Sequence, residues 1–169
     1  LVGVDTSGVR NTINSHAHVN LVDTELLAAS DMQLLAHTNE NMQVNGYIYN
    51  VSAVGGSETR VTNTINNDDA IKLKNSKLTT PKAGTDITLS AADDIKLFTY
   101  AYAETGTGIV TGSNAIMHNY FTRDNSIKLE GAGNSLYSMQ DINLYAGKLA
   151  DGNVATLDLD AESADFSGA

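Results

Sequence analysis

The residues of this chain best suited to bind a metal ion are three histidines in its first third. His16 and His18 are two residues apart, and His37 follows His18 by nineteen residues. On a strand the first two imidazoles share a face, and one turn of a repeating fold would bring the third near enough to hold zinc or nickel. No acidic residue recurs at a matching spacing to complete the set. We therefore expect solvated histidines, with no metal and no cofactor.

Acidic residues near the middle of the chain raise the question of glycan cleavage. A β-helix that cleaves polysaccharides needs carboxylates and a basic residue that converge in one groove, and Asp93, Asp94 and Lys96 contain these groups. They fall inside a repeated sequence pattern, in which they are typical of turn and outward strand positions. We therefore assign no catalytic residue, expect the chain not to be an enzyme, and expect no turnover of acidic glycans.

Four tyrosines form two pairs with the same internal spacing. Each pair begins five residues after the start of a strand-like unit, and the residues are Tyr47, Tyr49, Tyr100 and Tyr102. Because both pairs occupy the same position in their units, we expect them on the same face of the fold, three coils apart in the β-helix derived below. They either pack in the core, which is the common fate of aromatic residues, or form an exposed strip that binds a sugar or a protein.

The elements that would position these residues belong to an internal repeat. The segment Asn-Thr-Ile-Asn at 11–14 returns at 63–66, and a weaker copy begins at Asn119, so the copies are 52 and 56 residues apart. A second marker, an Asp followed by an apolar-polar-apolar triplet, begins 55 residues apart at Asp31, Asp86 and Asp141. Fixed periods of this size predict a solenoid, a propeller or an array. The repeats are approximately 11–62, 63–118 and 119–169.

Short apolar-polar-apolar units predict the strands. The units are 19–21, 32–34, 42–44, 71–73, 87–89, 95–97, 127–129, 142–144 and 157–159. They lie too close together for the helices of a doubly wound sheet, and they are too short and too poor in aromatics for a propeller. An all-β, right-handed parallel β-helix fits best, with about three coils per 52–56-residue repeat. At ~4.8 Å per coil, nine coils would form a rod about 43 Å long.

Alternation along these units predicts which side chains are buried. The inward residues are Val19, Leu21, Met32, Leu34, Ile71, Leu73, Ile87, Leu89, Ile127, Leu129, Ile142 and Leu144. The outward residues are Asn20, Gln33, Lys72, Thr88, Lys128 and Asn143. With three coils in each repeat, the matched Asn11, Asn63 and Asn119 would lie three coils apart and would not touch.

Composition narrows the choice of partners. The formal net charge is −10, from 20 acidic and 10 basic residues, and such a chain repels phosphate, so we expect no nucleic-acid partner. Cysteine is absent, which excludes disulfides and thiolate metal sites. The sequence has no apolar run of spanning length and no signal-like leader, so we expect no membrane span and no signal. It does not begin with Met, and we expect residues 1–169 to be a single β-helix segment of a longer protein.

Several of the repeated units resemble those of a known family. Segments 86–91 (Asp-Ile-Thr-Leu-Ser-Ala) and 141–146 (Asp-Ile-Asn-Leu-Tyr-Ala) are similar to the degenerate repeats of large filamentous-haemagglutinin-like adhesins. The Asn-Thr-Ile-Asn segments are most similar to leukotoxin-type filamentous adhesins. The resemblance covers nearly the whole chain, although each motif is short. It implies a right-handed β-helix from a long surface exoprotein, exported through an outer-membrane transporter by two-partner secretion, with no catalytic residues.

Two functions follow from this reading. The first is a structural stalk segment of a secreted surface adhesin, which projects a binding tip or contributes to attachment to a host surface protein or glycan. The alternative is a carbohydrate-binding or polysaccharide-cleaving β-helix of the tailspike or lyase kind. A glycan-binding β-helix builds its groove from loop insertions, whereas the loops here are expected to stay short, and this favours the stalk.

Overall fold

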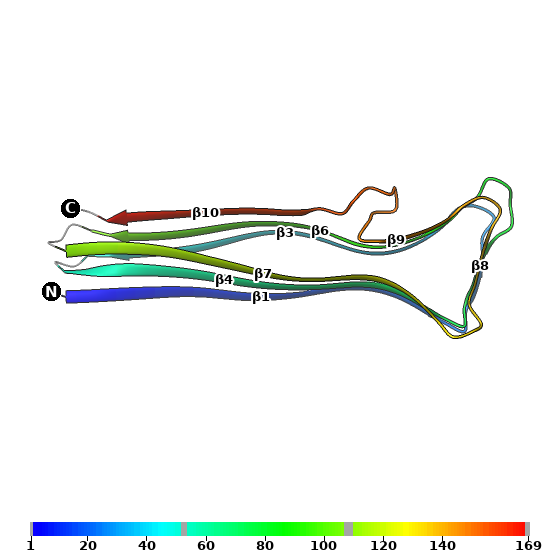
Figure 1. The fold of residues 1–169 in the computed structure, drawn as a ribbon, viewed down its shortest axis with the longest axis horizontal. Coiled ribbons are helices and arrows are strands. Elements are labelled where there is room, and N and C mark those ends of the chain that lie inside the picture. The colour runs from blue at the N-terminus through cyan, green and yellow to red at the C-terminus, as the bar shows by residue number, and fades with distance from the viewer. Residues whose placement is uncertain (1, 52–53, 107–109, 168–169) are drawn as a thin grey trace.

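The chain folds into three stacked coils of β-strand (Figure 1). The computed structural model describes residues 2–51, 54–106 and 110–167. The first coil contains β1 (Val2–Val22), β2 (Glu25–Leu27) and β3 (Met32–Asn50). The second contains β4 (Val54–Lys74), β5 (Lys77–Thr80) and β6 (Ile87–Thr105). The third contains β7 (Val110–Glu130), β8 (Ser135–Ser138), β9 (Ile142–Ala146) and β10 (Leu157–Ser167).

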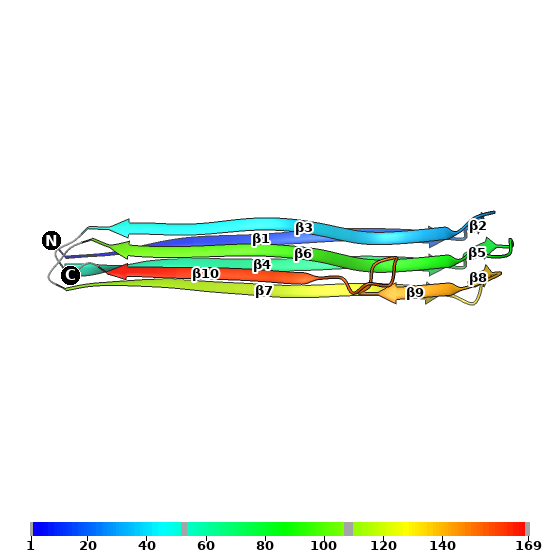
Figure 2. The same cartoon turned by 90° about the horizontal axis from the view of Figure 1, so that it is seen from above.

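Strands of successive coils pair in parallel and build three sheets. Two long sheets, β1-β4-β7 and β3-β6-β10, face each other, and the short sheet β2-β5-β8 closes one end (Figures 1 and 2). β9 also pairs with β6, ahead of β10. These features confirm the predicted all-β parallel β-helix. In the described part of the chain, no helix has the length and hydropathy needed to cross a membrane.

The size of a coil differs from the prediction, because each repeat forms one coil and not three. Val54 pairs with Val2 in the first coil and with Val110 in the third, and the register then holds along strands of 21 residues. The prediction failed because polar residues occupy inward positions between the apolar units, so one long strand looked like several short ones. Instead of a nine-coil rod, the protein has strands of about 70 Å and a stack about 10 Å deep between its outer backbones.

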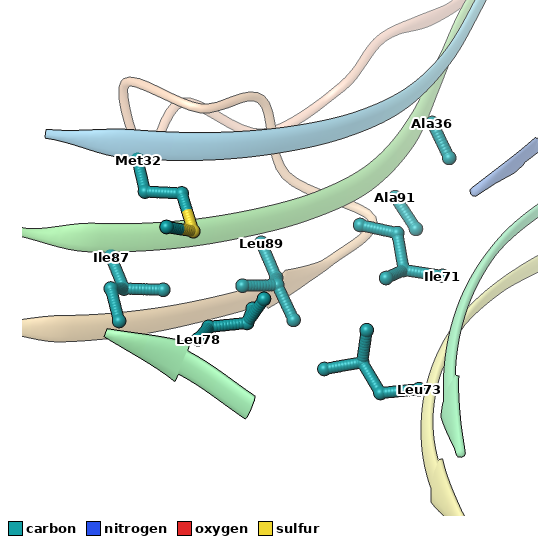
Figure 3. Packing of buried hydrophobic residues seen from close by; sticks show 8 residues of the cluster. All are labelled: Met32, Ala36, Ile71, Leu73, Leu78, Ile87, Leu89 and Ala91. Carbon is teal, nitrogen blue, oxygen red and sulfur yellow. The ribbon is translucent and has the colours of Figure 1, made fainter. Parts of the chain in front are cut away.

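The apolar core lies between the long sheets and is best shielded in the middle coil. The largest cluster of buried side chains lies near the closed end and comprises Met32, Ala36, Ile71, Leu73, Leu78, Ile87, Leu89 and Ala91 (Figure 3). A second cluster contains Ile65, Ile95 and Leu97.

The predicted inward and outward positions fall into rows that run across the coils. Ile142 and Leu144 occupy the same rows as Ile87 and Leu89, yet they are 43% and 46% exposed because a terminal coil has a neighbour on one side only. The predicted outward residues form two rows on the outer faces, Asn20-Lys72-Lys128 and Gln33-Thr88-Asn143. Thr88 is nevertheless only 6% exposed, in the middle coil between Gln33 and Asn143.

A ladder of asparagines crosses the interior. Asn11 Nδ2 donates to Asn63 Oδ1 at 3.0 Å, and Asn63 Nδ2 donates to Asn119 Oδ1 at 2.8 Å. Asn63 is 1% exposed and also donates to Thr99 Oγ1 at 3.2 Å. The expectation that these three residues do not touch is therefore wrong. With one coil per repeat, matched asparagines become neighbours, and each amide satisfies the next.

A layer of charged groups separates the two apolar clusters. Asp93 is fully buried, and its carboxylate accepts two bonds of 2.7 Å from the Arg123 guanidinium and one of 2.7 Å from Asn125 Nδ2. Asp69 is also fully buried. The backbone N–H of Ala17, the hydroxyl of Thr38 and the amide of Asn67 donate to its carboxylate. Desolvated carboxylates persist only with such partners.

Truncation of Leu89 tests the core. We expect Leu89→Ala to lower the free energy of unfolding by about 2–4 kcal/mol through the cavity it leaves. Chemical denaturation measures the loss. The control is Gln33→Ala, an exposed outward position on the same sheet, which should stay within about 0.5 kcal/mol of the parent. Equal losses for the two variants would contradict the assignment of inward and outward faces.

Removal of Arg123 tests the buried charge layer. We expect Arg123→Met to cost about 3–5 kcal/mol, because the Asp93 carboxylate would remain buried without its cation. The matched control is Arg60→Met, which removes an exposed arginine that pairs with Glu58 at 3.2 Å and should cost at most about 1 kcal/mol. A loss for Arg123→Met no larger than that of the control would show that water reaches Asp93.

Candidate functional site

The four tyrosines form a strip on the outer face of the sheet β3-β6-β10, exposed at Tyr47 and Tyr49 and half-buried at Tyr100 and Tyr102. Tyr47 is 60% exposed and Tyr49 is 50% exposed. Tyr100 and Tyr102 lie beside them on β6, where they alternate with the buried residues Thr99, Ala101 and Ala103 and point to the opposite face. The structure therefore places these residues on the outer face and not in the core.

The interior behind the strip has no room for aromatic rings. A Cβ atom added at Gly46 would lie 2.5 Å from Val61 Cγ2 and 2.9 Å from Thr59 Cγ2, so the two long sheets approach closely at this level. The inward positions of β6 here are filled by small side chains, including Ala101 and Ala103. The narrow core therefore requires the tyrosines to face outward.

Stacking orders the rings of the strip. Tyr47 pairs with Tyr102 in the register of β3 and β6, and their rings are nearly parallel with centroids 5.2 Å apart. Tyr100 lies against Tyr102 at 6.3 Å. The pairs are thus adjacent across one coil boundary, and not three coils apart as predicted. The Tyr102 hydroxyl donates to Glu104 Oε2 at 2.7 Å, and this hydrogen bond raises the pKa of Tyr102 to about 12.

A loop insertion in the third coil projects from this outer face (Figure 1). Ala91 and Ile95 of β6 are four residues apart, whereas their partners Ala146 and Leu157 are eleven apart. The expectation that all loops stay short is therefore wrong here. Asp94 Oδ1 anchors the loop by accepting bonds from the Thr156 N–H at 2.7 Å and the Thr156 hydroxyl at 3.0 Å. The backbone hydrogen bond holds the pKa of Asp94 below its ordinary value.

The insertion forms one wall of an open polar groove of about 480 Å³. Its polar lining residues are Asn39, Asn41, Asp94, Lys96, Asn153 and Thr156. The groove and the tyrosine strip lie on the same outer face, because Asp94, Lys96, Tyr100 and Tyr102 are alternate residues of β6 that point the same way. This face combines hydrogen-bonding groups with aromatic rings.

The candidate catalytic set from the sequence is not assembled. Asp93 points inward and is bound by Arg123, whereas Asp94 and Lys96 point outward into the groove. The placement of Asp93 at a turn or outward position was wrong. Strand alternation separates adjacent carboxylates to opposite faces, so Asp93 and Asp94 do not converge on one substrate.

The three histidines also divide between the two faces. His16 and His18 lie on β1, whereas His37 lies on β3, in the opposite long sheet, and contacts Ser90 Oγ at 2.7 Å. The hypothesis that all three imidazoles approach one another is therefore wrong. Asp68, which pairs with His16 in the neighbouring coil, lies beside the first two histidines instead. Spacing in the sequence did not reveal this neighbour, because the predicted coil was about a third of the true coil length.

Comparison with known proteins finds no matching family model, no matching characterised protein and no matching solved structure. The resemblance to filamentous adhesins therefore rests on the repeated sequence units alone.

Proposed function

We propose that this chain is a structural repeat segment of a secreted bacterial surface adhesin. In this role it extends a longer protein from the cell and contributes to attachment to a host protein or glycan. The observation that supports it most is the unbroken register of the coils, which stay paired residue by residue along 21 positions of β1, β4 and β7. In such a segment each coil pairs along its length with the next coil, and a stalk of many coils requires this stacking.

Repeated side-chain bonds at the turns support the same proposal. Asp31 Oδ1 accepts the backbone N–H of Asp86 at 2.9 Å, and Asp86 Oδ1 accepts that of Asp141 at 3.0 Å. In each coil, the aspartate that precedes β3 or β6 thus binds the backbone of the matching aspartate in the next coil, and so fixes the start of the strand that follows it there. This explains the second sequence marker, and it means that an added coil would bring its own ladder bonds and core rows.

Duplication of a coil tests this modular behaviour. We expect a chain with a second copy of residues 54–109 inserted after residue 109 to fold as a four-coil solenoid, because the copy restores every row. Its free energy of unfolding should exceed that of the parent, since each internal interface adds stability. Circular dichroism and chemical denaturation measure both effects.

The control is the same insertion with Thr64 of the new copy deleted. A one-residue slip exchanges the inward and outward side chains beyond the deletion, so this variant should be less stable than the parent. A four-coil chain that is no more stable than the parent, or two insertions of equal stability, would contradict a stalk built by coil stacking.

A second candidate function is glycan binding on the outer face of β3-β6-β10. The observation that favours it is the tyrosine strip beside the polar groove, since sugar rings stack on aromatic faces while amides and charged groups bond their hydroxyls. The exposed ring of Tyr47 is already stacked on the half-buried ring of Tyr102, so the platform is ordered before a ligand arrives.

Truncation of the strip tests glycan binding. We expect Tyr47→Ala and Tyr100→Ala each to weaken retention of the protein on a glycan array by about tenfold or more, the size typical of losing one aromatic anchor. The control is Tyr120→Ala, which removes a 55% exposed tyrosine from the other long sheet. No glycan retention, or equal retention of all variants, would exclude the strip as a sugar platform and leave the stalk proposal intact.

A further inference from the structure

The outer face of the opposite sheet, β1-β4-β7, holds a cluster of metal-binding side chains. His16 and His18 are alternate residues of β1 and point outward, and Asp68 of β4 pairs with His16 in the parallel register. The three side chains can each direct one ligand atom to a common centre, because these atoms lie within 4.8 Å of one another. The cluster thus joins the first coil to the second.

The distances in the cluster are close to those of a metal site. His18 Nε2 lies 3.0 Å from Asp68 Oδ2, and the His16 and His18 rings are 5.9 Å apart between centroids. Ligand atoms bound at about 2.0–2.1 Å in a tetrahedron are roughly 3.3 Å apart. His18 and Asp68 are hydrogen-bonded to each other through Nε2 and Oδ2, and a metal ion would replace the proton between them. Their side chains are 40% and 42% exposed, so they can rotate through the remaining distance once that bond is replaced. The paired strands hold the backbone, and only side chains need to move.

We propose that His16, His18 and Asp68 form a binding site for a divalent transition-metal ion, best suited to zinc. Two imidazoles and a carboxylate match the ligands that zinc takes in open sites, where a fourth position is left for water. Imidazole nitrogens favour zinc, nickel and copper over magnesium and calcium, which prefer oxygen ligands.

The surroundings favour a cation. Asp124 occupies the same row as Asp68 in the third coil and adds negative charge beside the cluster, in a chain with a formal net charge of −10. A bound ion would join β1 to β4 and would stabilise the folded stack by mass action. The proposal does not depend on the stalk or glycan-binding functions.

Zinc titration of the intact chain, followed by isothermal calorimetry and thermal melting, tests the site. We expect one saturable zinc ion per chain with a Kd in the micromolar range, about 1–10 μM, and a melting temperature that rises with zinc. His16→Ala and His18→Ala should each weaken binding at least about tenfold, and Asp68→Asn should weaken it to a smaller degree. The matched control is His37→Ala, which removes a histidine from the other sheet and should leave zinc affinity unchanged.

Nitrogen-resolved NMR of the unmodified protein gives a test that needs no variant. Zinc should shift the imidazole signals of His16 and His18 and leave those of His37 and His118 in place. Binding weaker than about 1 mM, binding unaffected by His18→Ala, or zinc-induced shifts centred on His37 or His118 would overturn the proposal.

Discussion

The structure depends on the stacking of each residue on its counterpart in the next coil. In-register parallel pairing places Asn63 between Asn11 and Asn119, so the environment of a side chain is set largely by its own copies. This constraint explains why the interior of a long, thin fold tolerates asparagine. An amide that donates to one copy and accepts from the other is satisfied without water. The same logic places Asp86 between Asp31 and Asp141 at the turns.

Buried polar groups also fix how the long strands align. A sheet whose inner face carried only aliphatic residues could slip by two positions at small cost, because apolar contacts are not directional. A slip here would separate Arg123 from Asp93 and Thr38 from Asp69, which would leave both buried carboxylates with fewer partners. We infer that these groups specify register more than they add stability, which is the best-attested use of buried polar contacts.

The sequence was sufficient to predict the fold class but not the length of a coil. Its aliphatic triplets, such as 71–73 and 87–89, mark core rows correctly, and their copies share those rows in the structure. The strand length could not be predicted, because inward residues such as Thr59, Asn63 and Asp69 are polar and conceal the alternation of a strand that is buried throughout. The wrong coil length also gave wrong neighbours for the residues of both candidate sites. With coils taken as too short, Asp68 was not placed beside His16, and Tyr47 was not placed beside Tyr102.

Strand alternation leaves the two outer faces free to differ between coils. An inward residue must fit the neighbouring coils and the facing sheet, whereas an outward residue contacts mainly solvent. The row that contains His16 therefore continues as Asp68 and Asp124. In the same way, the loop insertion of the third coil projects from the outer face of the β3-β6-β10 sheet, and the inward pairing of Leu89 with Leu144 is kept. Function in such a fold is expected where the repeat is broken on an outer face. Both candidate sites meet this condition: the tyrosines with the groove on one sheet, and the histidines with Asp68 on the other.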